Sequence, residues 1–125
     1  IMSIANKDRK ILILGYKDVR RGVEFRKSEN DKIVSNQKSI YDNVHKILNA
    51  FKVVSFDNLA IEQLEVSRLM SEDEWNEFFM GEDGNYTMYI DLVKQQFARC
   101  SIAEIRYDLL DDVVDMFNVI RGEKF

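Results

Sequence analysis

Four aspartates near the C-terminus have the spacing of a single helix face. They occur at i, i+3, i+4 and i+7 and are Asp108, Asp111, Asp112 and Asp115. Like charges at these spacings repel each other by about 0.2–0.5 kcal/mol per pair. A cationic partner would relieve that repulsion, so the predicted chemistry is ionic recognition of a basic surface. A solvated acidic face, neutralised by Arg106 or by the basic N-terminal half, is the alternative.

A second acidic cluster combines charge with aromatic side chains. It consists of Glu72, Asp73, Glu74, Trp75 and Glu77, followed by Phe78 and Phe79. Aromatic anchors inside a charged rim are typical of protein–protein binding sites. The clusters 72–77 and 108–115 are therefore the predicted partner-binding residues. In the competing interpretation, 72–77 is an ordinary helix that packs its phenylalanines inward and leaves its acids in solvent.

A candidate site of opposite sign lies in the N-terminal half. Residues 1–54 hold twelve Lys/Arg against six Asp/Glu, a net charge of +6, whereas residues 55–125 have a net charge of −10. Basic residues beside aromatic ones are typical of nucleic-acid binding. The residues concerned are Lys17, Arg20, Arg21, Arg26 and Lys27, near Tyr16 and Phe25. Because the acidic half would repel phosphates, nucleic acid is the less favoured partner.

Catalytic and metal-binding patterns are weak. His45 is the single histidine, at the edge of a predicted apolar helix stripe, and Cys100 is the single cysteine. One histidine and one cysteine cannot form a structural zinc site. Residues 83–85 resemble the start of a calcium loop, but Met88 and Lys94 stand where such a loop needs glycine and glutamate. We therefore expect no enzyme, no metal and no cofactor.

Apolar periodicity predicts the elements of the first half of the chain. An apolar run predicts a buried strand over 9–15, and alternation predicts a partner strand over 22–26, so that 16–21 would form a basic hairpin loop. A 3.6-residue period predicts a helix over 36–51, with a strand over 52–56 after it. The segment 59–70 fits either state, and its alternation favours a strand.

Capping signals organise the second half. Ser71 and Glu74 have capping-box spacing and predict a helix through residue 80, ended by Gly81. Residues 86–93 are rich in β-formers and predict a strand, with a second strand over 97–100. Ser101 and Glu104 predict the start of a last helix, over 102–120.

These elements predict an α+β fold in a single globular domain, residues 2–125, starting at Met2. An antiparallel-rich sheet of about four to five strands would pack with about three helices. The apolar runs are too short to cross a membrane, no signal peptide is seen, and an unpaired cysteine fits the cytoplasm.

The expected function is a non-catalytic protein-binding module, such as an inhibitor or an immunity or antitoxin-type protein. Its acidic patches would dock on a basic protein partner, such as a nuclease or a toxin. A nucleic-acid-binding regulator that uses the basic N-terminal hairpin is the alternative function. A homodimer in which the two charged halves face each other would also account for the polarity.

Overall fold

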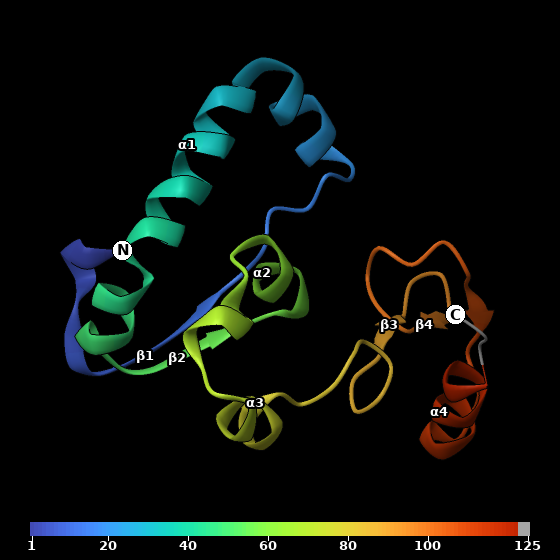
Figure 1. Ribbon diagram of the computed structural model, residues 1–125. Coiled ribbons are helices and arrows are strands. Elements are labelled where there is room, and N and C mark those ends of the chain that lie inside the picture. Colours follow the sequence, from blue (N-terminus) through green and yellow to red (C-terminus); the bar gives the residue numbers. More distant parts are fainter. Residues whose placement is uncertain (123–125) are drawn as a thin grey trace. The chain divides into compact units, whose positions relative to one another are not determined.

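The structure is a computed structural model, and it describes residues 1–122. Contacts divide the chain into two compact units, Ile1–Glu77 and Phe78–Phe125, and each unit is described by itself. The described residues form four α-helices and two small sheets (Figure 1). The α+β class is therefore confirmed, whereas the expected single antiparallel sheet of four to five strands is wrong. The single-domain assignment stays a prediction.

The first unit is built on a two-stranded parallel sheet. After a 3₁₀ turn, η1 (Met2–Ile4), strand β1 (Asn6–Ile13) pairs in parallel with β2 (Phe51–Phe56). Parallel strands need a long crossover connection, and helix α1 (Arg21–Ala50) supplies it (Figure 1). The strands predicted near 9–15 and 52–56 are present, but β1 is not a buried strand, since Ile13 is its single buried residue. The hairpin partner predicted at 22–26 is wrong because that segment lies in α1.

Helix α1 extends much further toward the N-terminus than the predicted 36–51. Its apolar face buries Ile33, Val44 and Ile47 at helical spacing, so the stripe that predicted the helix is confirmed. Once that stripe is packed, adding earlier turns is cooperative, and residues 24–32 are mostly charged or polar with several good helix formers among them. The alternation at 22–26 rests on two apolar residues, Val23 and Phe25, and stabilises a strand less than this extension stabilises the helix. The helix is kinked at Glu29, where φ is −129° and ψ is 27°.

The segment 59–70 is helical, so the predicted strand is wrong. Helix α2 (Asn58–Gln63) precedes a 3₁₀ turn, η2 (Val66–Leu69). Asp57 caps α2 by accepting a hydrogen bond from the Ala60 N–H at 2.8 Å. Ala60 and Leu64, four residues apart, are both buried against the core formed by the sheet and α1. A capped turn with an i, i+4 apolar pair outweighs the alternation of Leu64 and Val66.

Helix α3 (Glu72–Phe78) begins where its capping box predicts. The Ser71 N–H donates to Glu74 Oε2 at 2.9 Å, and the Glu74 N–H donates to Ser71 Oγ at 3.3 Å. Gly81 has the left-handed φ of +93° expected of a terminating glycine, but the helix ends three residues earlier. The competing interpretation, in which both phenylalanines pack inward, is wrong for Phe78, whose side chain is 63% exposed, whereas Phe79 is half-buried.

The second unit is a small antiparallel sheet with one helix. Strands β3 (Tyr89–Asp91), β4 (Gln96–Ala98) and β5 (Tyr107–Asp108) pair in the order β3-β4-β5. The strands predicted over 86–93 and 97–100 are thus present but shorter or shifted. Helix α4 (Val113–Arg121) packs on the sheet, and Phe97, Met116 and Ile120 form the buried core.

Helix α4 starts eleven residues later than the predicted 102–120, so the Ser101–Glu104 cap is wrong. Residues 107–108 pair with β4 instead, and Asp112 is the N-cap, accepting from the Val114 N–H at 2.6 Å. This start avoids a helix face with four aspartates. Asp111 and Asp112 fall at the positive end of the helix dipole, where carboxylates are stabilising.

We predict that Asp57→Ala lowers the free energy of unfolding of the first unit by at least about 1–2 kcal/mol, because it removes the oxygen that caps α2 and also accepts from the Gly15 N–H. Asp42→Ala, which only breaks the exposed pair with Lys38 on α1, should change that free energy by less than about 0.5 kcal/mol. Urea unfolding followed by the fluorescence of Trp75 would measure both. Equal effects of the two substitutions would contradict the capping role.

Candidate functional site

The charge polarity of the chain lies inside the first unit. Residues 57–77 hold seven Asp/Glu and one arginine, a net charge of −6, whereas residues 1–56 have a net charge of +6. The negative segment folds into α2, η2 and α3. We call its exposed carboxylates the acidic surface: Glu62, Glu65, Glu72, Asp73, Glu74 and Glu77.

Most of the acidic surface has no partner within the unit. The ion pairs seen are Arg26–Asp18, Lys27–Glu24 and Lys38–Asp42, all inside residues 1–56. Within residues 1–122, the carboxylates of four members make no ion pair and no hydrogen bond; these are Glu62, Glu72, Asp73 and Glu77. Neutralisation of these carboxylates by the basic half is therefore not seen.

Trp75 lies in a groove beside these carboxylates. The groove has a volume of about 520 Å³ and is lined by Ile61, Glu62, Glu65, Ser67, Arg68 and Trp75. Trp75 is half-buried, and no residue of α3 is fully buried. Helix α3 therefore contributes little to the core and presents its side chains to solvent.

Two of the charged residues on the wall of this groove, Glu65 and Arg68, are held in place by Tyr41 of α1. The Arg68 guanidinium lies 3.7 Å from the centre of the Tyr41 ring and donates to the Tyr41 carbonyl at 2.9 Å. The Tyr41 hydroxyl donates to Glu65 Oε2 at 3.0 Å. Sequence reasoning missed Glu62, Glu65 and Arg68 because their segment was interpreted as a strand; the cap at Asp57 was the available signal.

The second predicted patch does not form a helix face. Asp108 lies in β5, Asp112 is the cap of α4, and only Asp115 is within a helix, in its first turn. Asp111 precedes the cap. All four are exposed, and all four belong to the second unit.

The basic segment is a loop and a helix start, not a hairpin. Lys17 and Arg20 lie in the loop after β1, and Arg21 begins α1. Arg26 pairs with Asp18 at 2.9 Å, and Lys27 pairs with Glu24 at 3.0 Å. These pairs occupy two of the five predicted cations and weaken the case for a nucleic-acid interface.

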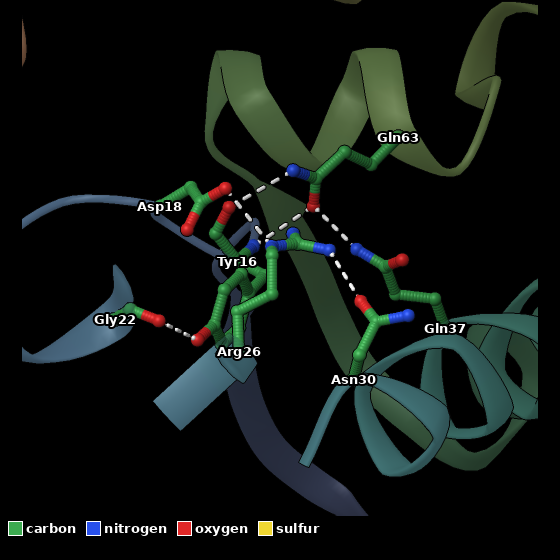
Figure 2. A network of polar contacts seen from close by, with 7 residues as sticks. All are labelled: Tyr16, Asp18, Gly22, Arg26, Asn30, Gln37 and Gln63. Carbon is green, nitrogen blue, oxygen red and sulfur yellow. Dashed lines mark hydrogen bonds and ion pairs between the residues drawn. The ribbon is translucent and has the colours of Figure 1, made fainter. Parts of the chain in front are cut away.

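A network of polar contacts fixes the loop after β1 (Figure 2). The Gln63 side-chain amide makes two hydrogen bonds to the Tyr16 backbone: it accepts from the N–H at 2.8 Å and donates to the carbonyl at 3.0 Å. Gln37 of α1 donates to the same Gln63 oxygen at 3.0 Å. The Tyr16 hydroxyl donates to the Gly22 carbonyl at 2.5 Å. The sequence gives no signal for this network, which joins residues up to 47 positions apart.

The residues considered for catalysis are not assembled into a site. His45 is exposed on α1, and Cys100 is half-buried in a turn where no helix begins. Over residues 1–122, no three His, Cys, Asp or Glu side chains form a group that could hold a metal ion.

Comparisons of the chain with protein-family models, with curated proteins and with solved structures find no match. No helix within residues 1–122 has both the length and the apolar character needed to cross a membrane.

We predict that Ser71→Ala raises the pKa of Glu74. In the folded chain, hydrogen bonds from the Ser71 N–H and hydroxyl hold the pKa of Glu74 below its ordinary value of 4.5. The stabilisation is therefore present above about pH 4.5 and is lost as the pH falls through the folded pKa. Carboxyl titration by NMR would measure the change, with Ser67→Ala as the control. An unchanged Glu74 pKa in Ser71→Ala would contradict a contribution from the hydroxyl.

Proposed function

We propose that this chain is a non-catalytic protein-binding module, of the inhibitor or immunity and antitoxin type, which docks its acidic surface on a basic protein partner such as a nuclease or a toxin. The observation that carries the proposal is the set of unpaired carboxylates around the half-buried Trp75. An unpaired cysteine agrees with an encounter in the cytoplasm.

The two parts of this surface would act at different stages of binding. Exposed, unpaired carboxylates attract a basic partner over distances of about a Debye length, roughly 8–10 Å, and so raise the association rate. Trp75 would then be covered by the partner. Burying a tryptophan at the centre of an interface commonly dominates the affinity, whereas rim charges contribute mainly rate and specificity.

The remaining predicted residues have a subordinate place in this proposal. Asp108, Asp111, Asp112 and Asp115 would add to the negative field of the chain without forming a second anchor, because they do not share one helix face. A second copy of the chain is a competing partner, since the first unit itself carries a basic segment.

The double variant Asp73→Lys/Glu77→Lys should associate with a basic partner about tenfold or more slowly than the unmodified chain at low salt. The difference in association rate should be smaller at high salt. Immobilised chain would capture partners from the native host at low salt, and stopped-flow kinetics would follow with the purified partner. Glu29→Lys/Asp31→Lys on α1 makes the same charge change outside the acidic surface and should leave the rate nearly unchanged. An equal loss in both variants would indicate a general charge effect and contradict docking here.

Trp75→Ala should weaken binding of the same partner by about thirtyfold or more, mainly through faster dissociation. Trp75→Phe should retain part of the affinity because it keeps an aromatic side chain. Calorimetry would measure the affinity of both variants for the partner. In the unmodified chain, the fluorescence of Trp75, the single tryptophan, would report its burial by the partner. Unchanged affinity of Trp75→Ala, or capture of only a second copy of the chain, would contradict the proposal.

A further inference from the structure

A cavity at the end of β1 is separate from the acidic surface and shares no lining residue with the Trp75 groove. Its volume is about 440 Å³, within the roughly 300–1,000 Å³ of small-molecule sites. It lies where β1 ends at Ile13 and the chain turns through residues 14–17 toward α1. In open α/β sheets, ligands bind beyond the carboxyl ends of the strands, and this cavity lies at the corresponding end of β1. The cavity therefore occupies a favoured position for a ligand site.

The wall of this cavity is fixed by contacts that need no ligand. The Gly15 N–H donates to Asp57 Oδ1 at 2.9 Å, which draws the loop against α2. A Cβ on Gly15 would lie 2.6 Å from Leu59 Cγ and 2.7 Å from the Ala60 nitrogen, so only glycine fits. The Gln63 amide holds Tyr16 on the other side of Gly15 (Figure 2). A preformed wall lowers the entropic cost of binding.

The cavity lining has an apolar body and one positive charge. Most of its side chains are apolar, contributed by β1, α1, α2 and the loop. Its polar side chains are Tyr16, Lys17, Asn36, Gln37 and Gln63, and no carboxylate lines it. Lys17 is the single charged residue of the lining, and the exposed Arg20 and Arg21 follow it. The local charge thus favours an anion, although the chain as a whole is negative.

We propose that this cavity binds small aromatic monocarboxylic acids. Phe25, which is 43% exposed on α1, would pack against the aromatic ring together with the apolar lining. The Lys17 ammonium would pair with the carboxylate as a charge-assisted hydrogen-bond donor. The side chain of Asn36 is exposed at the same cavity and makes no hydrogen bond among residues 1–122, so its amide supplies a donor. The proposal is independent of the proposed docking of the acidic surface.

The test uses three probes with one aromatic body and different head charges: 2-naphthoate, 2-naphthamide and 2-naphthylmethylammonium. Titration of the ¹⁵N-labelled full chain would be followed by amide chemical shifts. We expect 2-naphthoate to bind with a dissociation constant of order 1 mM or below, with shifts confined to residues 13–17, 33–40 and 60–64. The amide should bind about fivefold to tenfold more weakly, and the cation more weakly still.

Two pairs of variants separate the parts of the site. Lys17→Gln should reduce the affinity for 2-naphthoate to that for the amide and leave amide binding unchanged. Lys32→Gln, on α1 and outside the cavity lining, should change neither affinity. Phe25→Ala should weaken the binding of both 2-naphthoate and 2-naphthamide. Val34→Ala changes an exposed residue outside the cavity and should weaken the binding of neither probe. Three results would each overturn the proposal. The first is equal affinity for the three probes, and the second is the absence of chemical-shift changes at residues 13–17, 33–40 and 60–64 up to about 10 mM probe. The third is full retention of 2-naphthoate binding in both Lys17→Gln and Phe25→Ala.

Discussion

One carboxylate oxygen joins the parts of the first unit on which everything else depends. Asp57 Oδ1 accepts from the Gly15 N–H at 2.9 Å and from the Ala60 N–H at 2.8 Å. The Asp57 N–H also donates to the Ile13 carbonyl at 3.1 Å, which continues the contact between the two strands. The same residue therefore ends the sheet, starts α2 and sets the distance between α2 and the loop after β1.

Both proposed sites follow from this junction. Helix α2 carries Gln63 toward the cavity and Glu62 toward the Trp75 groove, because consecutive residues of a helix point in different directions. The cavity would lose its wall without the close approach of Gly15 to α2. The groove would lose one side, since Trp75 comes from α3 and its opposite side comes from α2 and η2.

The segregation of charge within the first unit has a physical consequence of its own. A net charge of +6 on residues 1–56 and −6 on residues 57–77 gives a unit with no net charge and strong local fields of both signs. The ion pairs form inside the basic segment, between residues of α1 or between α1 and the loop before it. The fields are therefore not cancelled by ion pairs across the two segments. The two proposed ligands, a basic protein at α3 and an anion at the cavity, match these local fields in sign.

The sequence by itself determined the elements whose signals are local. These are the helix stripe of 36–51, the strands near 9–15 and 52–56, and the capping box of α3 with its carboxylates and tryptophan.

Tertiary structure decided the elements that depend on distant partners. Residues 22–26 joined α1 because cooperative extension of a packed helix outweighs a short alternation. Residues 107–108 joined a sheet because β4 offered hydrogen bonds. The cavity and its Gln63 network were beyond sequence reasoning, since they arise only when β1, α1 and α2, far apart along the chain, are packed together.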